Sequence, residues 1–299
     1  MSNGTYTDIA ILDYGSLTFV RLAGAKPRPR VEKLRTVQLA AGTFEIGALT
    51  PSVRNPEAIA EAARRIKVEA GRLERVSILL PDSWFRINLI DVPKLPRRSS
   101  EANEVVRWSL KRLTPFNPNE LRMQWTQISS RGTEPVRILV ISALEKSLAA
   151  IEAAFAAAGI AVGSIEPTGL NVWNAILTRD TPADGRVLVY LRDGDFTTCV
   201  FRGTEPLFIR SRSLGGERRV EQEIRLSASF LRPMLETNPV AKCYIAGNGQ
   251  VTGHVIDVLA QEFGAEVEVL DLLAFADTAA VDTRHNEAEI IACRGVLTA

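Results

Sequence analysis

The sequence predicts an α/β protein made of two similar halves. Each half opens with strand, turn, strand, turn and strand, and then continues into helix and strand, which indicates divergent copies of one α/β unit. The chain has 299 residues, which is more than one ordinary hydrophobic core organises. Between the halves, Thr181-Pro182-Ala183-Asp184-Gly185 has the composition of a linker.

The first half begins as a β-meander, because apolar runs alternate with turn residues such as Asp13-Tyr14-Gly15-Ser16. A helix starts at Asn55-Pro56-Glu57, where asparagine can cap the helix and proline is tolerated at the first helical position. The predicted elements are the strands Asp8 to Leu12, Leu17 to Leu22, Val31 to Leu39 and Val76 to Leu80, and the helix from Asn55 to about Glu69.

Residues 84–142 are predicted to form an insert in this half. Pro93 and Pro96 bracket a loop, and the apolar residues that follow it recur at helical spacing. The predicted elements of the insert are the strands Phe85 to Val92, Leu121 to Ile128 and Val136 to Ser142, the turn Ser130-Arg131-Gly132, and the helix Ser100 to Leu113.

An alanine-rich helix returns the chain to the first half. Ser142 and Glu145 have the spacing of a capping box, and Gly159 supplies the stop signal. The strand Ile160 to Ile165 and the helix Thr168 to Leu177 complete this half.

The second half repeats the meander and then forms a long helix, predicted from Glu217 to about Glu236, with a bend or stop near Pro233. Its predicted strands are Val187 to Leu191, Phe196 to Phe201, Leu207 to Ser213, Cys243 to Ala246 and Glu266 to Leu270. The predicted domains are therefore 1–83 with 143–182, 84–142, and 183–299.

Composition narrows the classes of function. The 36 basic and 35 acidic residues give no overall attraction to nucleic acid. No signal peptide or bilayer-spanning run is present, so a cytoplasmic protein is expected. Cys199, Cys243 and Cys293 are predicted to be buried thiols, and His254 and His285 stand alone, so no metal site is predicted.

Motifs of catalysis are absent from the sequence, which contains no Walker loop, HExxH or GxSxG elbow. Glu217, Glu221 and Glu223 lie in an arginine-rich predicted helix, where solvated charge pairing is their expected role. These observations favour a binding protein over an enzyme.

Four segments carry a family resemblance: Asp13 to Ser16, Leu80 to Phe116, Leu207 to Gly216 and Ala292 to Leu297. Taken in this order, they resemble the actin-like superfamily and, within it, the PilM family of type IV pilus assembly. Asp13-Tyr14-Gly15-Ser16 resembles the first phosphate-binding turn. The stretch from Leu80-Pro81 to Leu113-Thr114-Pro115-Phe116 is similar to the subdomain inserted in PilM, and Leu207-Phe208-Ile209-Arg210 with Leu214-Gly215-Gly216 and the ending from Ala292 to Leu297 are similar to later signatures. The cytoplasmic part of GspL, from type II secretion, is the second resemblance.

The resemblance implies duplicated actin-like (ribonuclease H-like) domains with an FtsA/PilM-type insert. It also implies a site for ATP and magnesium, in which glycine lets the backbone approach an anion and aspartate holds a hydrated cation. The candidate positions are Asp13, Gly15, Ser16, Asp193, Gly194, Gly215, Gly216, Gly247, Asn248 and Gly249.

Two departures from the family pattern argue against nucleotide binding. Tyr190-Leu191-Arg192 stands where the second phosphate turn should carry its aspartate, although a shifted register would bring Asp193 into place. Gly215-Gly216 also runs directly into the returning helix, so the second lobe is predicted to be reduced and to lack its own subdomain. We therefore expect no cofactor, with ATP and magnesium as the weaker alternative.

The insert keeps the family pattern. In the PilM family, the groove between the insert and the first domain takes the N-terminal cytoplasmic peptide of PilN, an inner-membrane protein, so the resemblance implies a PilN-like partner. The candidate contact residues are Trp84, Phe85, Ile87, Glu104, Trp108, Leu110 and Phe116. The alternative is that the aromatic residues among them build the core of the insert.

The stretch Lys94 to Arg112 holds six basic residues against Glu101 and Glu104. It is either an ordinary solvated helix face or a surface for anionic lipid or an acidic partner.

Three functions stay open. The first is a scaffold of a type IV pilus or type II secretion-like assembly, held at the inner face of the inner membrane by its partners. The second is an ATP-regulated form of the same protein, and the third is a small-molecule kinase of the same fold.

Overall fold

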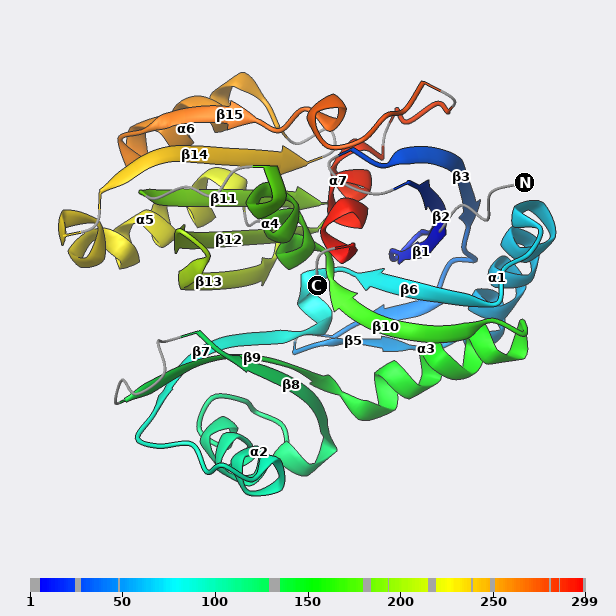
Figure 1. Cartoon of the computed structure of the whole chain (residues 1–299), viewed down its shortest axis with the longest axis horizontal. Helices are drawn as coiled ribbons and strands as arrows, with labels where there is room; N and C mark the ends of the chain where they lie inside the picture. Colours follow the sequence, from blue (N-terminus) through cyan, green and yellow to red (C-terminus); the bar gives the residue numbers. More distant parts are fainter. Residues whose placement is uncertain are drawn as a thin grey trace.

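Two five-stranded sheets with the same topology form the framework of the molecule (Figure 1). The computed structural model describes residues 6–24, 28–47, 49–128, 135–179, 184–192, 194–214, 219–237, 239–247, 251–279, 281–284 and 286–297. In each sheet an antiparallel meander of three strands is followed by two parallel strands, which confirms the predicted duplication. We call the parts built on the first and second sheets the first lobe and the second lobe.

The first sheet has the strand order β10-β6-β1-β2-β3 and the second has the order β15-β14-β11-β12-β13. The first contains β1 (Tyr6–Leu12), β2 (Ser16–Ala23), β3 (Arg30–Gln38), β6 (Arg75–Leu80) and β10 (Ala161–Pro167). The second contains β11 (Gly185–Arg192), β12 (Asp195–Arg202), β13 (Glu205–Ser213), β14 (Val240–Gly247) and β15 (Glu266–Val269).

Alternation along the strands divides each lobe into two packed layers. In β1, Ile9 and Ile11 face the space between the sheets, whereas Ala10 and Leu12 face the outer helices of their lobe. The outer helices are α1 (Pro56–Ala70) and α3 (Glu145–Ala157) in the first lobe, and α5 (Val220–Thr237) and α6 (Gly253–Phe263) in the second.

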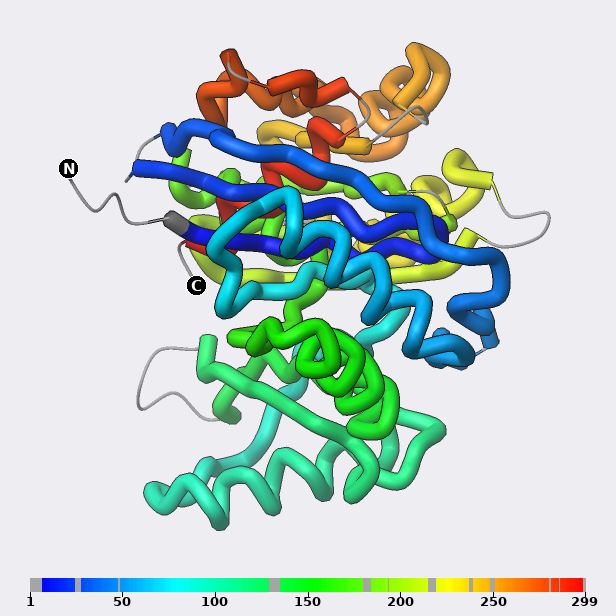
Figure 2. Tube along the Cα trace, turned by 90° about the vertical axis from the view of Figure 1, so that its right-hand side faces the viewer, coloured from blue at the N-terminus to red at the C-terminus, as the bar shows by residue number. Residues whose placement is uncertain are grey.

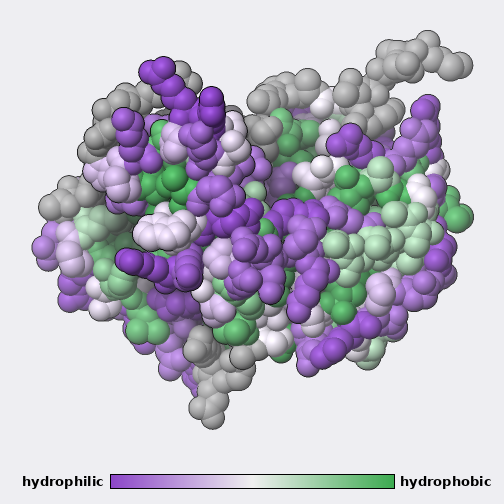
Figure 3. Space-filling view, turned by 90° about the horizontal axis from the view of Figure 1, so that it is seen from below, coloured by the Kyte–Doolittle hydropathy of each residue, from purple (hydrophilic) through white to green (hydrophobic). Residues whose placement is uncertain are grey.

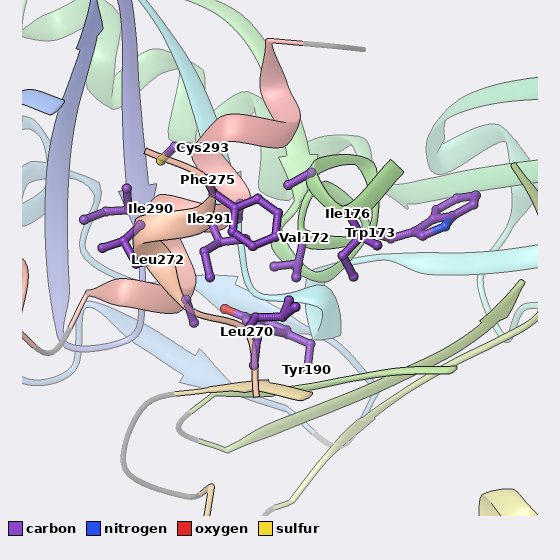
Figure 4. Close-up of a cluster of buried hydrophobic side chains, with 14 of the residues drawn as sticks. Val172, Trp173, Ile176, Tyr190, Leu270, Leu272, Phe275, Ile290, Ile291 and Cys293 are labelled. Carbon is purple, nitrogen blue, oxygen red and sulfur yellow. The ribbon is translucent and has the colours of Figure 1, made fainter. Parts of the chain in front are cut away.

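Two helices, α4 (Thr168–Arg179) and α7 (Glu287–Val296), lie between the sheets and join the lobes through one core. Figure 4 shows side chains of both helices gathered with Tyr190 of β11 and with Phe275, which follows the short helix η3 (Leu272–Ala274). The two helices approach closely at Gly295, where a Cβ atom would lie 1.9 Å from the carbonyl oxygen of Asn171.

The insert is a three-stranded sheet covered on one face by a helix, and it lies below both lobes in Figures 1 and 2. Its strand order is β7-β9-β8, with β7 (Arg86–Val92), β8 (Leu121–Gln127), β9 (Val136–Leu144) and the helix α2 (Ser99–Leu110). The short helices η1 (Asp82–Trp84) and η2 (Pro118–Glu120) begin the insert and lead into β8. The sheet of each lobe and the sheet of the insert are each built from segments of one predicted domain. The exact boundaries of the three domains remain a prediction.

Some predicted details were wrong. Ser142 lies inside β9, and α3 has Leu144 at its N-cap without a side-chain hydrogen bond, so the capping box does not form. Pro233 lies within α5, which continues to Thr237. A small hairpin of β4 (Phe44–Ile46) and β5 (Pro51–Val53) was not predicted, and the turn Ser130-Arg131-Gly132 lies outside the described residues.

All three cysteines are buried free thiols, as predicted. Within the described ranges, no helix is both long and apolar enough to cross a membrane.

Candidate functional site

The ends of several strands meet where the two lobes face each other. Because β1, β6 and β10 are parallel, the residues after them (Asp13, Asp82 and Thr168) come together at one edge of the first sheet. In open α/β sheets, ligands bind at the carboxyl ends of strands, so this edge is the first candidate site. The end of β11 faces it from the second lobe, and its last residue, Arg192, reaches into the site.

Arg192 links the two lobes through buried ion pairs. Its Nε donates to Oδ2 of Asp13 at 2.9 Å and lies 3.7 Å from Oε1 of Glu289, at the start of α7. The Arg192 side chain is 6% exposed, and its Nη1 also reaches the hydroxyl oxygen of Thr168 at 3.5 Å. A buried guanidinium requires such partners, because an unpaired charge in the interior is costly.

A second polar cluster crosses from η1 to β12. The hydroxyl of Thr197 donates to Oδ2 of Asp82 at 2.6 Å, and the backbone N–H of Gly169 donates to the other oxygen at 2.9 Å. Ser83 donates to Oδ2 of Asp195 at 3.0 Å and also shares a hydrogen bond of 2.7 Å with the hydroxyl of Tyr14. The start of the insert is therefore fixed to the second lobe by side-chain hydrogen bonds.

Burial weakens the acidity of both aspartates in this cluster. It raises the pKa of Asp82 to about 6, against the hydrogen bonds from Thr197 and Gly169. Burial, together with the charge of Asp82, raises the pKa of Asp195 to about 7. The Oδ1 atom of Asp195 is buried without a hydrogen-bond partner, which suits a carboxyl group that is protonated for part of the physiological pH range.

A cleft of about 820 Å³ opens beside these clusters, between β13, α5, the β4–β5 hairpin and the start of the insert. Its charged residues include three arginines, of which Arg210 pairs with Glu223 at 2.7 Å. The other two, Arg86 and Arg212, form no ion pair among the described residues, and burial and the charge of Arg212 lower the pKa of Arg86. Glu223 is buried, so the prediction that it is solvated was wrong.

The structure places only some of the predicted nucleotide residues. Asp13, Gly15 and Ser16 form the β1–β2 turn, and Gly194 has a φ of +80° in the β11–β12 turn. Gly247 packs against β11, since a Cβ there would lie 2.7 Å from the carbonyl oxygen of Leu191. The remaining predicted positions, Asp193, Gly215, Gly216, Asn248 and Gly249, lie outside the described residues.

A second candidate site is a groove of about 550 Å³ between the insert and the first lobe. Strand alternation in the insert creates one wall of it. Ile138 and Val140 of β9 face α2, whereas Leu139 and Ile141 face the groove. Gln124 of β8 is paired with Ile141 and lines the same wall.

The opposite wall comes from β10 and α4. β10 is the edge strand of its sheet, so one side of its backbone is free of strand partners within the described residues. Asn171 and Trp173 of α4 line the groove, and the Asn171 Oδ1 and Trp173 Nε1 atoms are buried without hydrogen-bond partners. Unsatisfied polar atoms and a free strand edge are features that an extended peptide can satisfy.

Charged side chains give the groove its polarity. Arg122 of β8 pairs with Glu145 at 2.6 Å and with Glu152 at 2.5 Å, and so ties the insert to α3. Glu166 of β10 accepts hydrogen bonds from Ser164 and Asn171 and forms no ion pair among the residues that the structure describes. Most of the exposed lining of the groove is apolar. The carboxylate of Glu166 is the one charged group of the lining that has no ion pair within the described residues, so it is available for a basic group.

The predicted partner-binding residues are divided between the groove, the core and the outer surface. Phe85 lines the groove, and Ile87 packs against the core between the sheets and the outer core of the first lobe. Trp84 is 3% exposed and packs in the core of the first lobe rather than in that of the insert, and Leu110 is fully buried in the insert core. The remaining three lie on or near the side of the insert that carries α2: Phe116 is half-buried against the insert core, and Glu104 and Trp108 are exposed.

Sequence reasoning missed most of the groove. Leu139, Ile141 and Gln124 were recognised only as parts of strands, and Asn171 and Trp173 only as parts of a helix. The continuous apolar run Ile138 to Ile141 in β9 was the available signal, because a strand that is apolar on both faces must be covered on both.

The two lobes with α4 and α7 between them, and an insert after β6, define a protein of the actin-like fold. The structure is similar to the PilM–PilN type IV pilus biogenesis complex, with 20% identity, a TM-score of 0.78, and coverage of 97% of this chain and 98% of that chain. No protein-family model matches the sequence, and no curated protein matches it significantly.

Two further solved structures share the fold. One is a protein of Bacteroides thetaiotaomicron with an actin-like ATPase fold and unknown function, with 11% identity, a TM-score of 0.56, and coverage of 98% of this chain and 96% of that one. The other is the cytoplasmic domain of EpsL, an inner-membrane component of the type II secretion system of Vibrio cholerae. It has 14% identity, a TM-score of 0.52, and coverage of 86% and 94%.

Proposed function

We propose that the chain is a scaffold of a type IV pilus or type II secretion-like assembly, located on the cytoplasmic side of the inner membrane. It binds the N-terminal cytoplasmic tail of a PilN-like membrane protein in the groove between the insert and the first lobe. The observation that carries the proposal is the groove itself, which occurs in a fold similar to that of the PilM–PilN complex.

The chemistry of the groove supports an extended, mainly apolar tail with a basic residue. The free edge of β10 offers backbone groups for strand addition, and Leu139, Ile141 and Phe85 offer apolar contact. Glu166 is the acceptor for a lysine or arginine of the tail.

Titration of labelled peptides by fluorescence anisotropy tests this function. The probes are the N-terminal tail of PilN and the cytoplasmic tails of single-span membrane proteins encoded beside this chain. The blocking variant is Gln124→Trp, which fills the groove without removing a core side chain. Thr126→Trp is the matched control, because Thr126 is exposed on the same face of β8 but does not line the groove.

We expect one of these peptides to bind wild type and Thr126→Trp alike and to bind Gln124→Trp at least tenfold more weakly, about 1.4 kcal/mol. Equal weakening by both substitutions, or binding by no peptide, would count against the groove.

We further propose that the site between the lobes does not use a nucleotide. Two features support this. Asp13, the carboxylate that a hydrated magnesium ion would need, is already paired with Arg192. Arg192 also stands where the second turn would supply a further oxygen ligand, and a guanidinium cannot ligate a cation. The described residues therefore do not fit a magnesium nucleotide.

A nucleotide-regulated scaffold is the second candidate function. It is favoured by the size of the cleft between the lobes and by the positive charges of Arg86 and Arg212, which form no ion pair within the described part of the chain. Thermal unfolding with and without millimolar MgATP separates the two. We expect no change in Tm; a ligand at 100 times its Kd would stabilise the fold by about 2.7 kcal/mol and raise the Tm clearly.

A further inference from the structure

The outer face of α2 carries an exposed tryptophan. The buried side of this helix is formed by Ala102, Val106 and Leu110, which pack on the insert sheet. Trp108 lies on the opposite side of the helix and is 66% exposed. Leu113, just after the helix, is 47% exposed. The other three tryptophans of the chain, Trp84, Trp125 and Trp173, are buried or half-buried.

Basic residues flank both ends of α2, and Arg112 lies over the ring of Trp108. The residues from Lys94 to Arg112 include six basic and two acidic side chains, a net of +4 in a chain whose net charge is +1. Lys94, Arg97, Lys111 and Arg112 are exposed and form no ion pair within the described residues. Figure 3, which views the molecule from the side of the insert, shows that hydrophilic residues dominate this face, with apolar areas between them.

Two members of the basic stretch have other roles. Arg107 donates to the backbone carbonyl oxygens of Pro118 and Leu121, so it fixes η2 against the helix. Arg98 lies 3.4 Å from Glu101. Glu104 is the remaining acidic group and is exposed on the same side of α2 as Trp108. The free positive charge therefore comes from the four unpaired residues.

From these observations we infer that the outer face of α2, which we define as Trp108 with the exposed residues that flank the helix (Lys94, Arg97, Lys111, Arg112 and Leu113), docks on a membrane surface rich in anionic lipid. An exposed tryptophan gains by placing its apolar ring below lipid headgroups while its N–H stays hydrated. The basic side chains extend to phosphate oxygens and keep their apolar stems against the ring and the lipid, as Arg112 already does 5.6 Å from the Trp108 ring centroid.

This orientation is compatible with the proposed tail-binding groove, and only this compatibility rests on the proposed function. The insert sheet has α2 on one face and the groove on the other. A tail that leaves the membrane beside α2 must pass a helix and a sheet layer, roughly 20 Å. About six extended residues span that distance, so a short tail reaches the groove.

Vesicle co-sedimentation of the full chain tests the inference. We expect binding to phosphatidylcholine vesicles that contain phosphatidylglycerol, little binding to phosphatidylcholine alone, and loss of binding at about 0.5 M salt because the charges are screened. Tryptophan emission should shift to the blue on binding in wild type but not in Trp108→Phe, since the other tryptophans are already shielded.

The charge-reversal variant Lys111→Glu/Arg112→Glu should weaken vesicle binding about tenfold or more. Its matched control is Arg65→Glu/Lys146→Glu, which makes the same charge change at exposed positions of α1 and α3. Equal loss in both variants would mean attraction by overall charge and would overturn the inference. The inference would also be overturned if wild type did not bind vesicles, which is the result expected of a face that binds an acidic protein instead. Binding without a blue shift of the tryptophan emission would overturn it as well. None of these results depends on the tail peptide.

Discussion

At the residue scale, one arginine determines how the two lobes meet. The guanidinium of Arg192 cannot ligate a metal ion at a nucleotide site. It can bridge the lobes, because it reaches Asp13 of the first lobe and Glu289 of α7 from one position. Removing the cation from such a group takes a favourable charge interaction away from carboxylates that are poorly solvated, which is costly.

We therefore predict that Arg192→Met lowers the free energy of unfolding by about 3 kcal/mol, since it removes the buried cation that lies between Asp13 and Glu289. Urea denaturation at pH 7 measures this value. Arg186→Met is the control, because Arg186 lies on the same strand and forms no ion pair among the described residues, and it should cost under about 1 kcal/mol. Equal effects of the two substitutions would show that the bridge contributes little.

The pair Asp82 and Asp195 makes a prediction about pH. Their folded-state pKa values, about 6 and about 7, lie above the usual value of 3.8. Between pH 3.8 and these folded-state values, the folded protein therefore binds more protons than the unfolded chain. Their contribution to stability is full below about pH 4 and is lost as the pH rises through 6 to 7.

Asp195→Asn keeps an acceptor for Ser83 but cannot ionise, so its stability relative to wild type should rise by about 1 to 3 kcal/mol between pH 5 and pH 8. Denaturation curves of both proteins at the two pH values provide the comparison. A difference that is the same at pH 5 and pH 8 would mean that Asp195 is ionised at both.

At the scale of single elements, the contact between α4 and α7 holds the two lobes to one core. Gly295 permits this contact, because any side chain there would meet the backbone of Asn171 at 1.9 Å. Gly253, at the start of α6, provides a neutral comparison, because a Cβ atom added there would have no neighbour within 4 Å among the described residues.

Gly295→Ala should therefore lower the Tm and destabilise the fold by at least about 1 to 3 kcal/mol, through overpacking. Gly253→Ala should leave stability unchanged or raise it slightly, because alanine is the better helix former. Calorimetry or thermal circular dichroism measures both. A Tm for Gly295→Ala equal to that of wild type would mean that the helices separate easily.

Most helices and strands were predictable from the sequence, and most of their boundaries agree with the structure within three residues. The strands of both meanders follow from apolar runs between turn residues, as at Asp13-Tyr14-Gly15-Ser16. Ser142 misled the prediction, because a capping residue and a strand residue look alike until pairing is known, and β9 extends to Leu144. Pro233 lies within α5, whereas local propensity predicts a bend or a stop there.

At the scale of the whole molecule, the groove could not be located from the sequence. Its walls come from segments of the chain as far apart as Gln124 and Trp173, and only the docking of the insert on the first lobe brings them together. The resemblance to the PilM family pointed to the insert, but it directed attention to Trp84 and Leu110, which are core residues. Exposed Trp108 lies on the other side of the insert sheet.

Hydrogen–deuterium exchange of the chain with and without a bound tail peptide tests the central claim most directly. Strand addition at the groove should slow exchange in β10 (Ala161–Pro167) and in the facing strands of the insert, while the turns at Asp13 to Ser16 and at Arg192 keep their free-state rates. Protection confined to those turns, with β10 unchanged, would contradict it.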